Sequence, residues 1–226
     1  MFLIKYILVY LYIMNNIRIL VKNLNLSSTE KMIIDSVKKF AKKELLPNVN
    51  NDFKNSRTRD LYKKFGQLGI LGPTIKNYNC LGLSYKMYGL IAKEIEYVDS
   101  GYRSMYSVQS SLVMNPINKY GTDRAKDKYI EKLSTGEYVG CFGLTEADTG
   151  SDAGSMKTNA VDDGSNYILN GSKTWITNAP VADVLLVWAK NNGVVKGFIL
   201  DRDMEGIETP KINKKMSLNT SDTGMI

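Results

Sequence analysis

The sequence predicts an α+β protein in which an all-helical N-terminal part is followed by a smaller β part. Apolar residues recur at helical spacing as far as Leu133, and short β-like segments follow from Tyr138 onward, with the change of period near Gly136. Turn residues typical of hairpins, Asn170-Gly171 and Asn191-Asn192-Gly193, occur in the second part. Because helices and strands are separated along the chain, two distinct layers are expected.

The first expected helix begins at Ser-Ser-Thr-Glu, residues 27–30, which has the form of a capping box. Ile33, Val37 and Leu45 belong to its apolar face, and Pro47 is expected to end it. Four further runs at helical spacing cover residues 59–68, 84–98, 102–114 and 122–133, with Gly69 closing the first of them. Their Met and aromatic side chains are interpreted as core rather than as ligand contacts.

Two hairpins are expected in the β part. Residues 167–169 and 174–176 flank Asn170-Gly171, and residues 184–188 and 194–200 flank Asn191-Asn192-Gly193. Paired strands on either side of such turns are the usual result of these signals.

Composition places the chain among ordinary globular proteins and excludes several classes of function. Of 226 residues, 43% are hydrophobic and 23% charged, and the net charge is +7. The lysines are scattered without interleaved aromatics, so nucleic-acid binding is not expected. The chain has no histidine and only Cys80 and Cys141. A His-based triad, a His-ligated metal, a disulfide framework and a metal site of Cys type are therefore not expected.

The first 26 residues are interpreted as a leader. Residues 2–14 are apolar apart from Lys5, and no acidic residue occurs before Glu30. The apolar run is short and interrupted for a membrane span, which needs about 20 residues, so stable membrane insertion is not expected. A cleavable targeting segment is the usual alternative, and a mitochondrial presequence fits in part, since such segments are poor in acids but also rich in Arg and Ser, which this one is not.

A strand-like run, residues 141–144, leads into hydroxyls, carboxylates and glycines at residues 145–152, which suits a polar, planar or phosphorylated ligand. Trp175 and Thr177 are two apart, so on a strand they would face the same ligand. The alternative is that Thr145, Glu146 and Asp148 are turn residues and that Trp175 is core.

Three segments carry a resemblance to a known family. Residues 141–152 read C-F-G-L-T-E-A-D-T-G-S-D and residues 170–178 read N-G-S-K-T-W-I-T-N, which resembles the flavin-binding core of the acyl-CoA dehydrogenases. Residues 96–104 read E-Y-V-D-S-G-Y-R-S and residues 107–114 read S-V-Q-S-S-L-V-M, which resembles the glutaryl-CoA dehydrogenases in particular. The resemblance extends from Ser27 to the last residue with almost no gaps.

The resemblance implies an N-terminal helical domain at residues 27–137 and an incomplete middle domain of β-barrel type at residues 138–226. The family then has a second helical bundle that supplies the catalytic Glu and part of the cofactor site, and its complete members are homotetramers. No residue of this chain corresponds to that base, which is expected beyond Ile226, so none is assigned as catalytic.

The resemblance also implies FAD as the cofactor. Leu144 and Thr145 would face the pyrimidine end, Trp175 would cover the ring system and Thr177 would approach N5. Arg103 would pair with the far carboxylate of a dicarboxylate thioester, oriented by Glu96, with a surface ion pair as the alternative. The expected FAD contacts are Phe142, Gly143, Leu144, Thr145, Gly150, Ser151, Trp175, Ile176 and Thr177, and the expected substrate contacts are Arg103, Ser104 and Ser151.

The function implied by the resemblance is the oxidative decarboxylation of glutaryl-CoA to crotonyl-CoA and carbon dioxide. Electrons would pass to an electron-transfer flavoprotein in the mitochondrial matrix, as part of lysine and tryptophan degradation. Two alternatives stay open: a catalytically incompetent fragment, and a short- or branched-chain acyl-CoA dehydrogenase. Residues 1–226 by themselves are expected to bind flavin weakly and to lack dehydrogenase activity.

Overall fold

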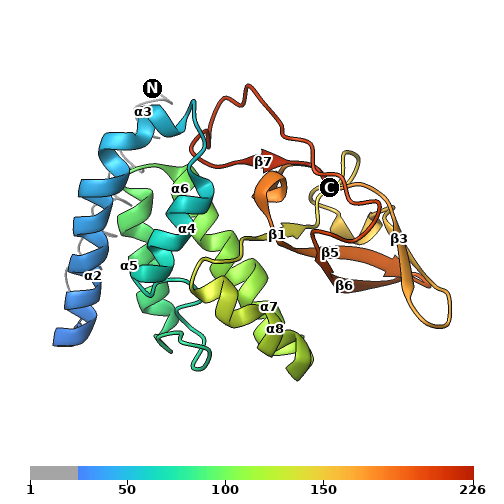
Figure 1. The fold of residues 1–226 in the computed structure, drawn as a ribbon, viewed down its shortest axis with the longest axis horizontal. Helices are drawn as coiled ribbons and strands as arrows, with labels where there is room; N and C mark the ends of the chain where they lie inside the picture. Colours follow the sequence, from blue (N-terminus) through green and yellow to red (C-terminus); the bar gives the residue numbers. More distant parts are fainter. Residues whose placement is uncertain (1–24) are drawn as a thin grey trace, which may run out of the picture. The chain divides into compact units, whose positions relative to one another are not determined.

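The computed structural model describes residues 25–226 (Figure 1). These residues divide after Asp35 into two compact units. In the first unit, the N–H of Ser27 donates to Oε2 of Glu30 at 2.8 Å, and the N–H of Glu30 donates to Oγ of Ser27 at 3.1 Å. The capping box is therefore confirmed at the start of α2 (Ser28–Phe40). The expected leader lies outside the described residues, apart from its last two.

The helical path does not end at Pro47, so that prediction is wrong. After α2 the chain forms a π-helical turn, η1 (Ala41–Leu45), a 3-10 turn, η2 (Leu46–Asn48), and then α3 (Val49–Asp52). The N–H of Leu46 donates to the carbonyl of Ala41, which widens the helix just before the proline. Because Pro47 lies in the first turn of η2, its missing N–H leaves no helical bond unmade.

The remaining predicted helices are confirmed within one to three residues at most ends. They are α4 (Thr58–Gln67), α5 (Tyr85–Glu96), α6 (Ser100–Ser107) continued by η3 (Val108–Met114), and α8 (Asp123–Ser134), with α7 (Asn115–Tyr120) between the last two. Ser84 and Thr122 cap α5 and α8 by accepting from backbone N–H groups. Their large apolar side chains form a buried core, as predicted: Leu61, Tyr62, Phe65, Met87, Ile91, Ile95, Tyr102, Met105, Tyr106, Val113 and Leu133.

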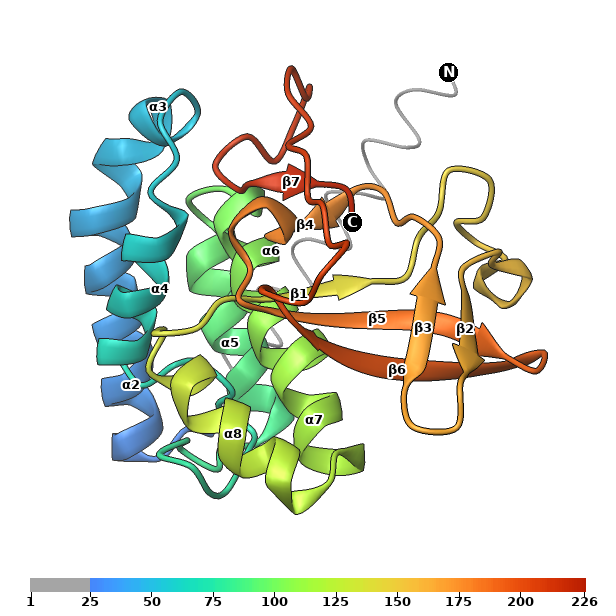
Figure 2. The ribbon, with the colours of Figure 1, turned by 45° about the vertical axis from the view of Figure 1, so that its right-hand side comes forward.

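The β part is an open mixed sheet, so the α+β class is confirmed but no closed barrel forms within residues 25–226. The sheet contains β1 (Gly140–Gly143), β2 (Asn159–Asp162), β3 (Tyr167–Asn170), β5 (Val184–Asn191) and β6 (Val194–Asp201). Their order is β1-β5-β2-β3, and β6 pairs with β5, as Figure 2 shows. A separate pair joins β4 (Ile176–Thr177) and β7 (Thr223–Gly224).

One of the two predicted hairpins is confirmed. Strands β5 and β6 are antiparallel with Asn191 opposite Val194, and Asn192 and Gly193 between them have φ angles of 50° and 79°. Two successive positive φ angles are those of a type I′ turn, for which Asn-Gly is the preferred pair.

The hairpin predicted at Asn170-Gly171 does not form. Strand β3 pairs with β2, and β4 pairs with β7. Gly171 is required by close packing rather than by a turn, because a Cβ there would lie 2.4 Å from Oγ1 of Thr158. The hairpin between β2 and β3 is closed by Asp163, whose carboxylate accepts from the N–H groups of Ser165 and Asn166.

Gln109 joins the helices to the sheet. Its buried amide donates to the carbonyls of Leu133 and Tyr138 at 3.0 and 2.8 Å and accepts from the N–H of Gly140 at 2.8 Å. A Cβ at Gly140 would lie 2.6 Å from the side chain of Val113. The first residue of β1 is thus fixed against η3, which sets where the loop after β1 begins. Over residues 25–226, no helix is long and apolar enough to cross a membrane.

Candidate functional site

The loop after β1 is a compact turn that presents hydroxyl groups. The N–H of Glu146 donates to the carbonyl of Thr149 at 3.0 Å, and the N–H of Thr149 donates back to the carbonyl of Glu146 at 3.3 Å. The half-buried side chain of Thr145 makes no hydrogen bond to any described residue, and the buried Oγ1 of Thr149 also lacks a partner there. Buried polar atoms are normally paired, so this loop has unused hydrogen-bonding capacity.

Beneath the loop, Glu146 and Lys173 form a buried ion pair. Nζ of Lys173 lies 2.7 Å from Oε1 of Glu146, and the two side chains are 1% and 7% exposed. Nζ also donates to the carbonyl of Leu144 at 3.1 Å. The carboxylate accepts from the N–H groups of Lys157 and Thr158 at 2.7 and 3.0 Å, and from the Thr158 hydroxyl. Both charges are therefore paired and hydrogen-bonded, as buried charges require.

The environment of Glu146 controls its protonation. Burial by itself raises the pKa of this carboxyl. The hydrogen bonds from Lys173, from the Thr158 hydroxyl and from two backbone N–H groups outweigh burial and lower the pKa to about 2. Glu146 is consequently an anion at neutral pH and stays one well into the acid range.

The second predicted segment lies beside the first. The N–H of Thr174 donates to the carbonyl of Thr145 at 2.9 Å. Trp175 is 62% exposed, which contradicts the alternative that it is a core residue. It also lies outside β4 and has a φ of 60°, so the prediction that Trp175 and Thr177 lie on one strand is wrong. A left-handed φ is uncommon for a bulky residue, and such strain occurs often at ligand sites.

Residues of α6 reach this segment. Oγ of Ser104 lies 3.4 Å from Oγ1 of Thr177. The neighbouring Arg103 donates from Nε to Oε2 of Glu96 at 2.7 Å, so the predicted contact between these two residues is confirmed. Their side chains are 38% and 43% exposed, which is also the geometry of an ordinary surface ion pair.

The other predicted ligand residues differ in what they present. Gly150 and Ser151 are exposed on the loop. Phe142 places its ring edge-on to Trp188 at 6.0 Å between centroids. Ile176 is buried in a core cluster with Cys141 and pairs with Gly224 of β7, so its side chain is not available to a ligand.

Sequence reasoning treated Glu146 as a possible turn residue and gave Lys173 no role. The available signal was weak. Lys173 is a single charge between Gly171 and an aromatic segment, and its partner lies 27 residues away. A pair so distant along the chain is recognised only in the folded molecule.

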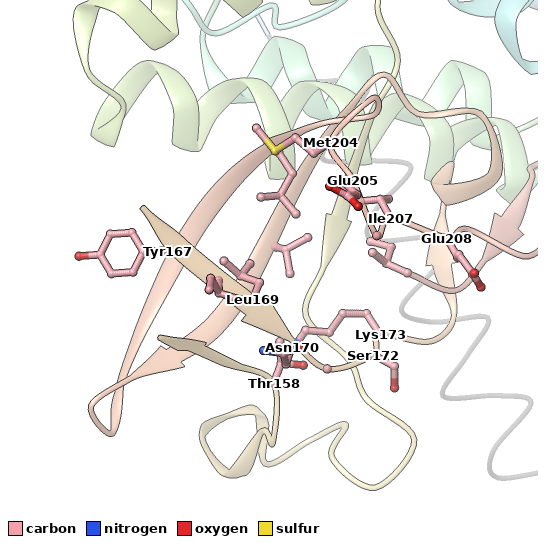
Figure 3. Close-up of a pocket in the computed structure, with 16 residues that line it drawn as sticks. Thr158, Tyr167, Leu169, Asn170, Ser172, Lys173, Met204, Glu205, Ile207 and Glu208 are labelled. Atoms are coloured by element: carbon pink, nitrogen blue, oxygen red, sulfur yellow. The ribbon is translucent and has the colours of Figure 1, made fainter. Parts of the chain in front are cut away.

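A pocket of about 530 Å³ lies beside Lys173 and Thr158 (Figure 3). Apolar side chains from β3, β5, β6 and the following turn line it, including Leu169, Val187, Leu200 and Ile207. Thr158 and Lys173 also line this pocket, whereas the predicted flavin and substrate residues do not. It is therefore distinct from the predicted ligand site.

The hydroxyl-rich loop after β1 and the exposed indole of Trp175 lie side by side. Such an arrangement suits a polar, planar ligand. Comparison with known families gives this class its name. Residues 27–137 match the model for the acyl-CoA dehydrogenase N-terminal domain, and residues 141–226 match that for the acyl-CoA dehydrogenase middle domain. The chain belongs to the acyl-CoA dehydrogenase family.

Individual relatives agree with this assignment. The mitochondrial isovaleryl-CoA dehydrogenase of Pongo abelii is 36% identical over 88% of this chain and 49% of its own length. A glutaryl-CoA dehydrogenase from Mycobacterium smegmatis, solved in complex with FADH2, is 42% identical, with a TM-score of 0.86 over 88% of this chain and 52% of the other. A glutaryl-CoA dehydrogenase in complex with glutaryl-CoA is 31% identical, with a TM-score of 0.84 over 90% and 54%. The chain spans about half the length of the relatives it matches.

Proposed function

We propose that this chain forms the N-terminal and middle parts of a flavin-dependent acyl-CoA dehydrogenase that acts on glutaryl-CoA. The observation that carries the proposal is the meeting of three segments: the loop after β1, residues 174–177 and Ser104 of α6. These segments come from both matched domains, and each contains residues that resemble the flavin or substrate contacts of the family.

The residues present fit FAD. An isoalloxazine ring is planar and aromatic, with hydrogen-bonding atoms along its edges. Trp175 offers an exposed indole on a strained backbone, and Thr145 offers a hydroxyl that no described residue uses. When bound, the flavin supplies the capacity to accept a hydride, and these side chains supply its position.

The charge of Arg103 favours glutaryl-CoA as the substrate over thioesters without a far carboxylate. The far carboxylate of a glutaryl group needs a positive partner when it leaves water, and a guanidinium is the side chain best suited to bind it in two places. Arg103 precedes Ser104, which touches the predicted flavin segment at Thr177. Its guanidinium is partly exposed and held at one nitrogen by Glu96, which leaves its other donors available.

A short- or branched-chain acyl-CoA is the second candidate. The observation that favours it is the same ion pair, because a guanidinium already neutralised by Glu96 attracts a substrate carboxylate less strongly. Similarity to an isovaleryl-CoA dehydrogenase is consistent with it. For either substrate, an electron-transfer flavoprotein is the proposed electron acceptor and the mitochondrial matrix the proposed location, both by resemblance to the family.

The substrate proposal predicts a selective effect of Arg103→Ala, measured in full-length enzyme that contains this chain. Loss of a charge-assisted contact worth roughly 1.5–3 kcal/mol should lower kcat/KM for glutaryl-CoA by roughly 10- to 150-fold. Butyryl-CoA has no far carboxylate, so its kcat/KM should change little.

Arg124→Ala, which removes an exposed guanidinium from α8, is the matched control and should leave both substrates unaffected. Equal losses on glutaryl-CoA and butyryl-CoA would show that Arg103 is structural and would favour the second candidate.

A further inference from the structure

Lys173 is a cation in a place where a cation is costly. Its side chain is 1% exposed and lies between β1, the loop after it and Met156. Removing an ammonium group from water is unfavourable unless its donors are fully used. Here Nζ has three neighbours that can accept: Oε1 of Glu146, the carbonyl of Leu144 and Sδ of Met156.

The backbone of Lys173 is fixed as firmly as its side chain. Its N–H donates to the carbonyl of Ile226 at 2.8 Å, and its carbonyl accepts from the N–H of Ile226 at 2.9 Å. The backbone of Lys173 is therefore paired with Ile226, and its side chain contacts the loop after β1.

The contacts of the ion pair reach the backbone of one predicted flavin contact, Leu144, and come within two residues of another, Trp175. On one arm, Nζ binds the carbonyl of Leu144, which directly precedes Thr145. On the other arm, Trp175 lies two residues after Lys173, and the N–H of Thr174 donates to the carbonyl of Thr145. Residues 144–146 and residues 173–174 are thus joined by hydrogen bonds at both ends, and the ion pair is one of these connections. The backbone of Thr145 is therefore held beside the segment that carries Trp175.

We propose that Lys173 and Glu146 are a pair of positioning residues, which hold the loop after β1 and the Trp175 segment in the arrangement that receives the flavin. The inference rests on the proposed function for the identity of the ligand. Neither side chain needs to touch the flavin, because both act through the backbone of residues 144 and 145. Lys173, but not Glu146, also lines the apolar pocket, where Figure 3 labels it.

The exposed pair Lys157–Asp148 provides a matched control. It has a similar length, 2.6 Å, and it lies in the same region, but its side chains are 75% and 68% exposed. Exposed ion pairs contribute little, so Lys157→Met should leave loop geometry unchanged. Lys173→Met removes the same charge from the buried position.

The first measurement is amide hydrogen exchange of the protein without flavin. Lys173→Met should increase exchange at residues 144–149 by at least tenfold and leave the strands β5 and β6 protected. Lys157→Met should match wild type at both places. Unchanged protection of residues 144–149 in Lys173→Met would overturn the inference, whether or not the wild-type chain binds FAD.

The second measurement is the dissociation constant for FAD in full-length enzyme that contains this chain, followed by quenching of flavin fluorescence. We expect Lys173→Met to raise it at least tenfold and Lys157→Met to leave it within twofold. FAD affinity in Lys173→Met equal to that of wild type would overturn the inference. Absence of FAD binding by full-length wild-type enzyme that contains this chain would instead overturn the proposed function, with the exchange experiment still deciding the role of the pair.

A double variant separates positioning from simple stability. In Glu146→Gln with Lys173→Met, no buried charge is left unpaired, and the amide oxygen can still accept from Thr158. Its melting temperature should return toward wild type, while FAD affinity stays at least tenfold weaker because the bond to the Leu144 carbonyl is missing. Recovery of both quantities together would show that the pair acts through stability alone and would overturn the inference.

Discussion

At the scale of single residues, Glu146 shows how a buried carboxylate is kept ionised. Four donors outweigh the cost of burial, and the pKa falls to about 2 from an ordinary value near 4.5. A carboxyl whose pKa is lower in the folded state stabilises the fold above its unfolded pKa, and this contribution is lost as the pH falls through the folded pKa. The relevant window for Glu146 therefore lies between about pH 4.5 and pH 2.

We predict that Glu146→Gln changes the pH dependence of stability in this window. At neutral pH the wild type should be the more stable protein by an amount of the order of 3 kcal/mol, from 1.4 kcal/mol per pKa unit. The difference should shrink as the pH is lowered from about 4.5 towards 2. Urea unfolding at a series of pH values measures it.

Asp148→Asn is the control for this experiment, because that carboxylate belongs to the exposed pair with Lys157. Its unfolding free energy should stay within about 0.5 kcal/mol of wild type at each pH. A constant difference between wild type and Glu146→Gln from pH 5 to pH 2 would contradict the assigned protonation behaviour.

At the scale of elements, the hairpin of β5 and β6 depends on two residues with positive φ. Asn192 and Gly193 adopt the left-handed region at 50° and 79°, and the eight pairs between the strands extend from Asn191 opposite Val194 to Val184 opposite Asp201. The turn thereby fixes the register of the central strand of the sheet, and a shift by one residue would exchange its buried and exposed faces.

Two glycines of this hairpin should respond differently to alanine. Gly193→Ala forces a side chain into the left-handed region and should destabilise the protein by about 1 kcal/mol. At Gly197, φ is not positive, and a Cβ would meet the Trp188 ring at 3.6 Å, an ordinary contact. Gly197→Ala should therefore be neutral or stabilising by about 0.5 kcal/mol. Thermal unfolding of the two variants compares them, and equal destabilisation would contradict the turn geometry.

At the scale of residues 36–226, the helices and the sheet are joined by buried polar side chains. Gln109 bonds the end of α8, the connection after it and the first residue of β1. Asn178 similarly donates to the Tyr62 hydroxyl at 2.7 Å and to the Gly140 carbonyl at 2.9 Å. These bonds link the two matched family domains, so the domains are expected to unfold together.

Gln109→Leu tests this connection. The change keeps the size of the side chain but removes the partner of the Tyr138 carbonyl and of the Gly140 N–H, while the Leu133 carbonyl keeps the N–H of Gly136 at 3.3 Å. The loss should cost about 3 kcal/mol. Gln67→Leu, at an exposed position of α4, should stay within about 0.5 kcal/mol of wild type. Urea unfolding followed by tryptophan fluorescence and by circular dichroism checks both the cost and the cooperativity. Two separate transitions in the wild-type protein would contradict the joint unfolding of the domains.

Local patterns in the sequence predicted much of the molecule. The helices follow from apolar spacing and from caps such as Ser84 and Thr122, which act within three residues. The Asn192-Gly193 turn was predictable for the same reason, because both positive φ angles belong to the turn itself. The family resemblance located the candidate site, and the contact between Glu96 and Arg103, seven residues apart near the start of α6, was also anticipated.

Features that depend on distant partners were decided by the tertiary structure. Asn170-Gly171 has a turn signal, but β3 pairs with β2, while Gly171 accommodates Thr158. Pro47 should end a helix, but the chain turns through η1 and begins η2 at Leu46, so Pro47 lies in a first turn where no N–H is required. Lys173 and Glu146 are 27 residues apart along the chain and form a buried pair only in the folded molecule. The sequence by itself determined the order of elements and the local turns, because those energies arise within a few residues. Strand partners, buried ion pairs and the exposure of Trp175 required the folded chain, because desolvation and packing exist only once distant segments meet.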